Sequence, residues 1–400
     1  MKLLPPPAFF FASCAVFPRI AGFSPMAGFW RAVCVQGLRA GAAMLLVATA
    51  LPVLAALPVE RIALPPGFHI EVLSDAVPSA RGMALSPKGI LYIGSLDGHV
   101  YALELQSGRV TARHVIASGL ETPAGVAWRD GALYVSAVSK ILRLDAIDAH
   151  LNDPPKPVVV TDTLPAETHH GWKFIAFGPD GKFYVPQGAP CNVCLKDRAR
   201  FGLIGRMDPD GSHYEVVARG VRNSVGFAWH PVTHELWFTD NGRDLMGDDV
   251  PDDKLNRAPR IGMDFGFPYC HGGDTPDPEF GKDHPCNTFT PPAVKLGAHV
   301  ASLGMRFYSG SMFPAAYRDN IFIAEHGSWN RSKKVGYRVV RVITNPDGSN
   351  ARQEVFAEGW LQPGESVWGR PADVQPMPDG SLLISDDYAG AVYRVTYSAP

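Results

Sequence analysis

Two adjacent histidines, His169 and His170, stand with Trp172 directly before an apolar stretch that is interrupted by a turn, in THHGWKFIAFGPDGKFYV (168–185). A neutral imidazole can take a proton from a hydroxyl group, because its pKa lies near neutrality. An indole offers a flat apolar face on which a planar ligand can stack. These residue types predict proton-transfer chemistry beside a planar or hydroxylated ligand.

Other polar side chains stand in short segments next to predicted strands. The formation of those strands does not require polar residues of these types. The segments are VRNS (221–224), TDNGRD (239–244), GAHVAS (297–302), EHGSWNRSKK (325–334) and WGRPAD (368–373). Arginine and lysine bind anionic groups, and tryptophan stacks on planar ones. The pattern predicts one convergent site that several loops build together, with a histidine base, cations and aromatic faces.

The elements that must position these loops repeat along the chain. The segment GMALSPKGILYIGSLDGHVYAL (82–103) contains a short apolar strand, a turn with proline and glycine, and a second strand rich in β-branched and aromatic residues. The same pattern returns at 124–145, 174–188, 225–242, 303–327 and 372–397. Repeats of roughly 40 to 50 residues, each with several short strands and little helical periodicity, predict an all-β fold, a six-bladed β-propeller.

The segment IALPPGFHIEVL (62–73) stands outside the repeats and has the composition of a strand. We expect this N-terminal strand to complete the last blade and so close the ring. A β-sandwich would need fewer strands and no fixed period. The long inserts 243–300 and 326–336 are expected to interrupt blades at loops, at the end of the ring where a binding site forms.

Charge divides the chain into two parts. The first 56 residues carry four basic and no acidic side chains, while the rest carries 33 basic and 39 acidic ones, a formal charge of −6. A mildly acidic body argues against nucleic acid as a partner. Arg31 and Arg39 precede the apolar GAAMLLVATALPVLAA (41–56), which is the layout of a secretory signal peptide.

We therefore expect residues 1–56 to be a leader and residues 57–400 to be a single catalytic propeller, periplasmic or secreted. A start at Met26 would give the signal peptide an ordinary length. An uncleaved membrane anchor is the alternative, although Pro52 and Pro58 disfavour a spanning helix.

Cysteine usage agrees with export. Cys14 and Cys34 lie in the predicted leader, and the body contains four cysteines, an even number that suits two disulfides in an oxidising compartment: Cys191, Cys194, Cys270 and Cys286. Pairing within CNVC (191–194) and between 270 and 286 is the simplest connectivity, and the two other pairings stay open. Zinc is a lesser alternative, because the spacing is not that of a zinc finger.

Several of the polar segments carry a family resemblance. RNSVGFAWHP (222–231), TDNG (239–242), DFGFP (264–268) and HGSWNR (326–331) resemble motifs of the soluble quinoprotein sugar dehydrogenases. HHGWKFIAFGPDGKFYVPQGAPCNVC (169–194) is similar to the branch called L-sorbosone dehydrogenases. The resemblance implies a six-bladed propeller that binds pyrroloquinoline quinone with a calcium ion and oxidises an aldose or a sugar aldehyde, passing electrons to an external acceptor, a cytochrome or a quinone.

The resemblance also implies roles for single positions. His170 matches the family's catalytic base, which takes the substrate hydroxyl proton while a hydride passes to the quinone. His169 falls where glucose-type members have an aspartate. Arg222 and Asn223 match an Arg-Asn pair that contacts the quinone, and Asn241 occupies the position of a cofactor-contacting glutamine.

The positions that bind the calcium ion and the quinone carboxylates in the family match this sequence less completely. Gly242 and Arg243 stand where the family has a Gly-Pro pair whose backbone carbonyls bind calcium, an ion that prefers oxygen ligands. Arg370 matches the first of two arginines that bind the quinone carboxylates, whereas Ala372 replaces the second. The resemblance therefore leaves one carboxylate partner to be found elsewhere.

The fifth-repeat loop is one source for that partner. Arg331 or Lys333 is expected to supply the missing cation, because the family places a lysine in this loop. Trp329, like Trp172, is expected to stack on the cofactor or the sugar, and His299 stands where relatives have another polar residue.

Two other classes of function remain open at this stage. A calcium-dependent propeller lactonase or other hydrolase would need acidic and amide side chains that point down the channel, for which Asp240, Asn241 and Asp373 are the candidates. A non-catalytic ligand-binding propeller is favoured if the arginine missing at Ala372 abolishes cofactor binding. The acidic DDVPDDK (248–254) lacks the spacing of an EF-hand and is interpreted as an exposed turn.

Overall fold

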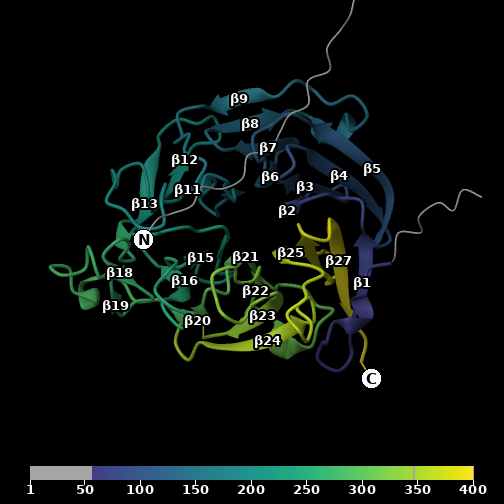
Figure 1. Ribbon diagram of the computed structural model, residues 1–400. Coiled ribbons are helices and arrows are strands. Elements are labelled where there is room, and N and C mark those ends of the chain that lie inside the picture. Colours follow the sequence, from purple (N-terminus) through teal and green to yellow (C-terminus); the bar gives the residue numbers. More distant parts are fainter. Residues whose placement is uncertain (1–55, 346, 400) are drawn as a thin grey trace, which may run out of the picture. The chain divides into compact units, whose positions relative to one another are not determined.

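The computed structural model describes residues 56–345 and 347–399. The predicted leader, including the signal peptide, Met26, Cys14 and Cys34, lies outside these residues except for Ala56. Six sheets, each with four antiparallel strands, follow one another round a ring (Figure 1). No helix among the described residues is long and apolar enough to cross a membrane.

The first three blades take their strands in chain order from the centre outward. The first contains β2 (Ala80–Leu85), β3 (Ile90–Ser95), β4 (Val100–Gln106) and β5 (Arg109–Ala117). The second contains β6 (Val126–Arg129), β7 (Ala132–Ala137), β8 (Lys140–Leu144) and β9 (Val158–Thr161). The third contains β10 (Ala176–Phe177), β11 (Phe183–Gln187), β12 (Leu203–Met207) and β13 (Glu215–Arg219), with β17 (Met263–Asp264) parallel to β13 at its outer edge.

The other three blades complete the ring. The fourth contains β14 (Phe227–Trp229), β15 (Leu236–Asp240), β16 (Asp252–Ala258) and β20 (Val294–Ala298). The fifth contains β21 (Ser302–Phe307), β22 (Ile321–Glu325), β23 (Arg338–Ile343) and β24 (Arg352–Glu358). The sixth contains β25 (Pro371–Pro376), β26 (Leu382–Asp386), β27 (Ala391–Tyr397) and β1 (Phe68–Ser74).

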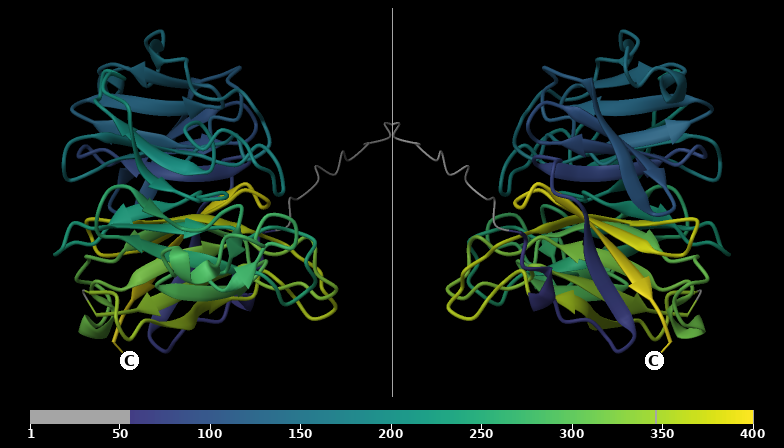
Figure 2. Two further views of the ribbon diagram at one scale, coloured as in Figure 1. Left: turned by 90° about the vertical axis from the view of Figure 1, so that its left-hand side faces the viewer. Right: turned by 90° about the vertical axis from the view of Figure 1, so that its right-hand side faces the viewer.

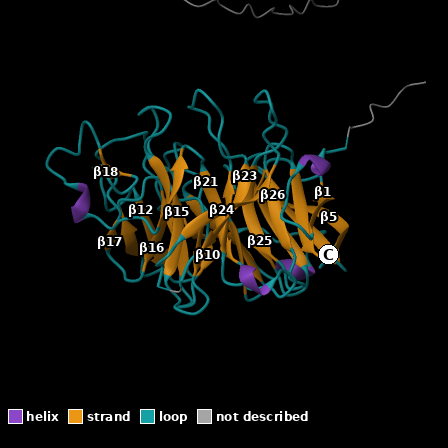
Figure 3. Ribbon diagram, turned by 90° about the horizontal axis from the view of Figure 1, so that it is seen from below, coloured by secondary structure: helices purple, strands orange, loops and turns teal. Residues whose placement is uncertain are grey.

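Helical structure in the described residues is confined to single 3₁₀ turns: η1 (Val59–Arg61), η2 (Ile147–Ala149), η3 (Cys286–Thr288) and η4 (Ala315–Tyr317). Figure 3 shows a ring that is almost entirely strand and loop, with longer loops extending from one side. The prediction of an all-β, six-bladed propeller is confirmed.

The N-terminal strand closes the ring, as predicted. β1 pairs antiparallel with β27, so that Phe68 lies opposite Tyr397 and Ile70 opposite Val395. Figures 1 and 2 show these two strands, from opposite ends of the described chain, side by side. The Phe68 ring packs 4.8 Å from Phe313 and 5.1 Å from Phe356. Burying such a ring contributes about 1.5–3 kcal/mol.

Each sheet packs on both faces against its neighbours in the ring, and this explains the apolar runs in the sequence. All six residues of β3 (ILYIGS) and of β7 (ALYVSA) are buried. A strand covered on both faces needs no polar alternation. The outermost strand β5 (RVTARHVIA) instead alternates over most of its length between exposed and partly buried residues.

An ion pair ties the first strands together near the centre of the ring. Arg306 of β21 lies 3.3 Å from Asp373 of β25, whose Oδ2 also accepts a hydrogen bond from the Met83 backbone N–H of β2 at 2.9 Å. The Arg306 guanidinium lies 4.6 Å from the centre of the Phe174 ring, just before the third blade. Three blades and the entry to a fourth therefore share one buried polar contact.

The segment 243–300 is not a single insert, because it contains β16 and β20, two strands of the fourth blade. The insertion proper is 259–293, which carries β17, β18 (Cys270–His271), β19 (Thr275–Pro276) and η3. The exposed-turn interpretation of 248–254 is also wrong in part. Asp253 and Lys254 are buried in β16. Lys254 pairs there with the buried Asp240 at 3.2 Å.

Two disulfides have the simplest predicted connectivity. Cys191 pairs with Cys194 in the loop between β11 and β12, and Cys270 pairs with Cys286 across the insertion. Among the described residues, no group of three or more His, Cys, Asp or Glu side chains could hold a metal ion. These four cysteines therefore act as structural links.

Candidate active site

The predicted site residues come from loops at one end of the ring. Neighbouring strands within a blade are antiparallel, so the start of each first strand lies beside the end of each second strand. The segments that hold the polar residues either enter a first strand or follow a second one. The fold thus gathers segments that lie far apart in the sequence.

A cavity of about 450 Å³ opens among these loops. Most of the predicted site residues line it: His169, His170, Trp172, Arg222, Asn223, Asn241, Gly242, His299, Trp329 and Arg370. Its wall also contains Asp244, His326 and Asn330, which lie in the predicted polar segments without having been assigned a role, and Arg81 and Asp253, which lie outside those segments.

His170 is held as a neutral imidazole with one nitrogen free for chemistry. Its Nδ1 lies 2.8 Å from the Ala189 carbonyl, which can only accept, so Nδ1 carries the proton and Nε2 is the acceptor. Burial, the nearby Arg222 charge and the His169 ring lower the pKa of His170 well below its ordinary value. The His169 ring centre lies 4.2 Å away.

The backbone at His170 is in the left-handed region, with φ 54°. Gly188 leaves room for His170 in this position, because a Cβ at position 188 would lie 2.6 Å from the His170 Cβ and 2.8 Å from its carbonyl oxygen. The close approach of the two loops therefore depends on the absence of a side chain at Gly188.

Arg222 is buried and almost fully occupied by protein partners. Its Nε donates to the Asn192 carbonyl at 2.8 Å, and its NH2 donates to Asn192 Oδ1 at 3.0 Å and to Asp244 Oδ2 at 2.9 Å. NH1 makes only a long contact of 3.4 Å with the Asn241 carbonyl. NH1 is thus the nitrogen of Arg222 best placed to bind a ligand.

Arg370 is anchored in a similar way on the opposite loops. Its Nε donates to the His326 carbonyl at 3.0 Å and its NH2 to the Gly327 carbonyl at 2.7 Å. The guanidinium lies 5.3 Å from the centre of the Tyr337 ring. Planar contacts of this kind fix the orientation of a guanidinium.

Arg81 and His326 line the cavity and form a second charged group with Asp387, which does not line it. Arg81 Nε lies 2.8 Å from Asp387 Oδ2, and His326 Nε2 lies 2.7 Å from Asp387 Oδ1. Burial opposes ionisation of Asp387, but Arg81 and His326 outweigh burial and lower its pKa. Burial lowers the pKa of His326 to about 4, so this imidazole is neutral near pH 7.

Asp253 links the loop that carries Gly242 to the one that carries Ala301. One oxygen accepts the Gly242 N–H at 2.7 Å, and the other accepts the N–H groups of Ala301 at 2.7 Å and Ser302 at 3.3 Å. Burial raises the pKa of Asp253 to about 7, although these three donors oppose the shift. Both oxygens serve to hold backbone, so Asp253 fixes the shape of the cavity wall.

The aromatic and imidazole candidates differ in exposure. Trp329 is 71% exposed at the cavity mouth, whereas Trp172 packs against the apolar group formed by Val225, Leu303 and Ala372. The Trp172 indole N–H is buried and has no hydrogen-bond partner among the described residues. His299 is buried, and its Nε2 lies 2.8 Å from the Gly247 carbonyl.

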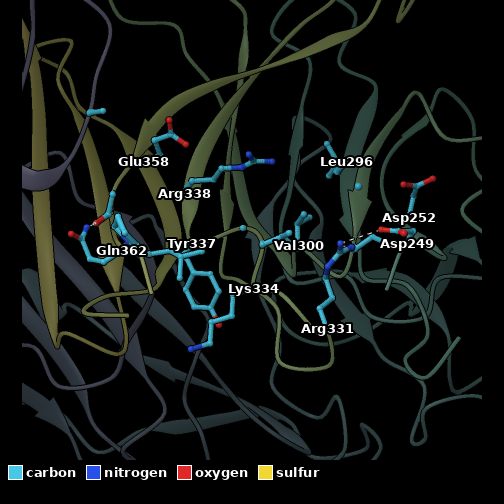
Figure 4. Close-up of a pocket in the computed structure, with 18 of the residues that line it drawn as sticks. Asp249, Asp252, Leu296, Val300, Arg331, Lys334, Tyr337, Arg338, Glu358 and Gln362 are labelled. Atoms are coloured by element: carbon cyan, nitrogen blue, oxygen red, sulfur yellow. Dashed lines mark hydrogen bonds and ion pairs between the residues drawn. The ribbon is translucent and has the colours of Figure 1, made fainter. Parts of the chain in front are cut away.

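Three predicted site residues, Arg331, Arg243 and Lys333, do not line this cavity. Arg331 lies in a separate, larger cavity of about 780 Å³ (Figure 4), where it pairs with Asp249 at 3.1 Å and donates to the Asp248 carbonyl. The Arg243 side chain pairs with Asp277 of the insertion. These partners direct both guanidinium groups away from the site, and Lys333 of the same loop as Arg331 is exposed and lines neither cavity.

The residues proposed for a hydrolase do not converge. Asp240 is buried against Lys254, and Asp373 is buried against Arg306 at the centre of the ring. Of the three candidates only Asn241 lines the cavity, where its Nδ2 donates to the carbonyls of Asn223 and Ser302. The three candidates therefore do not form one cluster in the cavity.

Fold and site together define a six-bladed propeller with an arginine-lined cavity at one end, and comparisons with known proteins place it more closely. An uncharacterised protein of Borreliella burgdorferi is 35% identical over 346 residues, which cover 83% of this chain and 90% of that protein. The chain belongs to the same protein family as this relative. The family described as TrAA12-like matches residues 206–398.

Solved structures share the fold at low identity. The Trichoderma reesei enzyme of Carbohydrate-Active Enzymes Family AA12 is 20% identical with a TM-score of 0.72, covering 84% of this chain and 98% of the enzyme. The PQQ domain of a Coprinopsis cinerea pyranose dehydrogenase is 18% identical with a TM-score of 0.70, covering 84% and 97%. The PQQ-bound aldose sugar dehydrogenase of Streptomyces coelicolor is 20% identical with a TM-score of 0.60, covering 84% and 100%.

Proposed function

We propose that this chain is a quinoprotein oxidoreductase that oxidises an aldose or a sugar aldehyde, such as L-sorbosone, with pyrroloquinoline quinone and calcium as cofactors. The observation that carries the proposal is the cavity itself. It brings an imidazole with a free Nε2, His170, together with the three guanidinium groups of Arg81, Arg222 and Arg370. The pyrroloquinoline quinone bound in the Streptomyces coelicolor structure, which shares this fold, supports the same assignment.

The donor set fits a planar tricarboxylate. Arginine is suited to carboxylates because its donors lie in one plane. Arg222 and Arg370 are each fixed through Nε and NH2, which leaves NH1 as the nitrogen directed to a ligand. The unpartnered indole N–H of Trp172 is a further donor to a ligand, because a buried donor ordinarily has an acceptor.

Arg81 supplies the cation that Ala372 does not. Ala372 is buried on β25, and Trp172 packs against it, so the place of a longer side chain is filled by the indole. The Arg81 guanidinium lies 5.6 Å from the centre of that Trp172 ring. We infer that Arg81, from the first blade, takes the role expected of a second arginine on the sixth.

Calcium would bind to backbone oxygen atoms of the loop at Gly242 and Arg243. This loop is tight, since a Cβ on Gly242 would lie 3.1 Å from the Pro251 ring and 3.3 Å from the Asp252 carbonyl oxygen. The two carboxylates that line the cavity already hold protein groups: Asp253 accepts from three backbone N–H groups, and Asp244 accepts from the Arg222 guanidinium. Backbone carbonyls are therefore the ligands that the loop offers to the ion.

The chain's own residues would prepare the proton transfer. The Ala189 carbonyl holds the Nδ1 proton, so Nε2 faces the cavity as an acceptor for the proton of a substrate hydroxyl. The positive charge of Arg222 disfavours protonation of His170 before substrate arrives. Arg81, Arg222 and Arg370 would orient the anionic cofactor, and the exposed Trp329 would cover the sugar. When bound, the quinone supplies the hydride acceptor, and the ion polarises it as a Lewis acid.

We place the enzyme in the periplasm or outside the cell, and electrons would leave to a cytochrome or a quinone. The two disulfides support an oxidising compartment. The alternatives, a calcium-dependent hydrolase or a non-catalytic binding propeller, are less well supported, because Asp240 and Asp373 lie in buried ion pairs while His170 keeps a free nitrogen.

The test is dye-linked oxidation of a panel of aldoses and of L-sorbosone by the purified chain, with and without pyrroloquinoline quinone and calcium. Activity that requires both additions and disappears in His170→Ala supports the proposal. Hydrolysis of a lactone without the quinone would support the hydrolase instead, and binding without any turnover would support a binding protein.

A further inference from the structure

The loop 188–194 contacts two polar residues that line the cavity, Arg222 and Asp244. Its residue Asn192 stands between Cys191 and Cys194, which form a disulfide. Asn192 does not line the cavity itself, but it contacts Arg222 and Asp244, which do. The loop therefore lies directly behind the cavity wall.

Asn192 makes four directional contacts with these two residues. Its backbone carbonyl accepts from Arg222 Nε at 2.8 Å, and its Oδ1 accepts from Arg222 NH2 at 3.0 Å. The same Oδ1 accepts the Asp244 N–H at 2.8 Å, while Nδ2 donates to the Asp244 carbonyl at 3.0 Å. The side-chain amide thus pairs with the Asp244 backbone in both directions.

These contacts determine which nitrogen of Arg222 remains for a ligand. Nε and NH2 are occupied by Asn192 and Asp244, so the guanidinium plane is fixed and NH1 alone lacks a short contact. The same loop holds the imidazole of His170 through the Ala189 carbonyl at 2.8 Å, and Ala189 N–H donates to the Arg222 carbonyl at 2.8 Å. The loop thus positions both the cation and the base.

We propose that Asn192, held between the two cysteines, is the positioning residue that orients Arg222 toward an anionic ligand, and that the Cys191–Cys194 disulfide serves this local purpose. The inference rests on the proposed function, in which that ligand is the quinone. Stabilisation by a disulfide grows with the length of the closed loop. The Cys191–Cys194 link has a sequence separation of 3, against 16 for Cys270–Cys286, so it restricts the unfolded chain less.

The two disulfides provide a matched comparison. No residue of 270–286 lines the cavity. Replacing both cysteines of one pair by serine is expected to separate the effect on the position of Arg222 from the effect on the stability of the fold. The Cys191→Ser, Cys194→Ser chain should bind pyrroloquinoline quinone about tenfold more weakly or worse, because charge-assisted hydrogen bonds to Arg222 are lost. The Cys270→Ser, Cys286→Ser chain should keep its affinity within about threefold and show the larger fall in thermal midpoint.

Two measurements test Asn192. The first is the dissociation constant of pyrroloquinoline quinone, followed by quenching of tryptophan fluorescence. Asn192→Ala is expected to weaken binding about tenfold or more. Asn192→Ala combined with Arg222→Ala should bind as weakly as Arg222→Ala alone, because Asn192 acts through that residue. The second is hydrogen exchange of the peptide 241–247 without any quinone, which should become faster in Asn192→Ala, since the Asp244 N–H loses its acceptor.

The outcomes separate the two proposals. Wild-type affinity and wild-type exchange in Asn192→Ala would overturn the positioning role. Additive losses in the double variant would overturn it as well. A wild-type chain that does not bind the quinone would overturn the proposed function, while the exchange measurement would still decide whether Asn192 holds the Asp244 loop.

Discussion

Arg81 of the first blade, which lines the cavity, forms an ion pair of 2.8 Å with Asp387 of the sixth blade. The two residues are 306 positions apart in the sequence, yet the closed ring places their blades next to each other. Since His326 binds the other oxygen of Asp387, removal of Arg81 would leave the carboxylate in direct contact with a neutral imidazole only, with Arg370 as a remaining nearby positive charge.

Arg81→Ala is therefore expected to weaken binding of pyrroloquinoline quinone about tenfold or more. The change removes one cation and leaves the negative charge of Asp387 less neutralised beside an anionic ligand. A fluorescence titration measures the change. Arg113→Ala is the control, because Arg113 lies over Tyr101 between strands β4 and β5, remote from the cavity. Equal affinities of the wild-type and Arg81→Ala chains would show that Arg81 does not replace the missing arginine.

His170→Ala should reduce turnover by about 10²–10⁴-fold, the usual contribution of a general base. The quinone dissociation constant should change by less than about threefold, because the imidazole acts on substrate rather than on the cofactor carboxylates. His169→Ala, in the adjacent exposed ring, should lose much less activity. A His170→Ala enzyme with normal turnover in the dye-linked assay would remove this residue from the mechanism.

The pH profile follows from the direction of the His170 shift. A histidine with an ordinary pKa of about 6.5 would lose about thirtyfold of its basic form between pH 8 and pH 5. Because the pKa of His170 is lowered, the imidazole stays neutral, and kcat/KM should not fall in this range on its account. Arg222→Gln removes one cause of the lowering, so an acid limb should move to higher pH. A limb near pH 6.5 that also persists in Asp253→Asn would contradict the assignment, because the pKa of Asp253 itself is raised to about 7.

Gly188→Ala tests the close approach between two loops. The new Cβ would lie 2.6 Å from the His170 Cβ, so the base must shift, and a displacement of about 1 Å can cost on the order of 100-fold in rate. Gly188→Ala added to His170→Ala should reduce turnover no further, because both changes act on one group. A full additional loss in the double variant would show that Gly188 acts elsewhere.

The central ion pair predicts a stability effect that is not additive. Asp373→Asn leaves the Arg306 charge without its partner in a buried site, which costs about 3–5 kcal/mol of unfolding free energy. Arg306→Met combined with Asp373→Asn removes both charges and should recover part of that loss. Urea unfolding of the single and double variants measures the difference. A double variant as unstable as the sum of its parts would argue against a direct coupling.

Local signals made much of the fold predictable. The strand and turn pattern returns in each blade, so segments such as 82–103 identify blades without knowledge of their neighbours. The segment 62–73 predicts the missing strand of the sixth blade because the repeats do not account for it, and the structure places that strand at 68–74. The charged sequence of β16 gave no such signal, since Asp253 and Lys254 are buried only because distant groups satisfy them.

The site was predictable where its residues lie in sequence motifs. It was less predictable where the direction of a side chain depends on its contact partners. Arg331 has the charge expected of a cofactor ligand, but Asp249 and the Asp248 carbonyl hold it in another cavity. Arg81 and Asp387 belong to no motif that marks them, and they meet only when the ring closes. Side-chain direction of this kind depends on contacts between blades, which one sequence does not reveal.

The pairing of β1 with β27 has a consequence for how the chain can fold during synthesis. An emerging chain can build its blades one after another, but it stays an open arc until its last strand is available to meet its first. Until then the exposed edges of both strands can pair with other chains. A chain that lacks only the seven-residue strand β27 would leave β1 without its partner and the ring open. We expect such a chain to aggregate rather than to form a five-bladed ring.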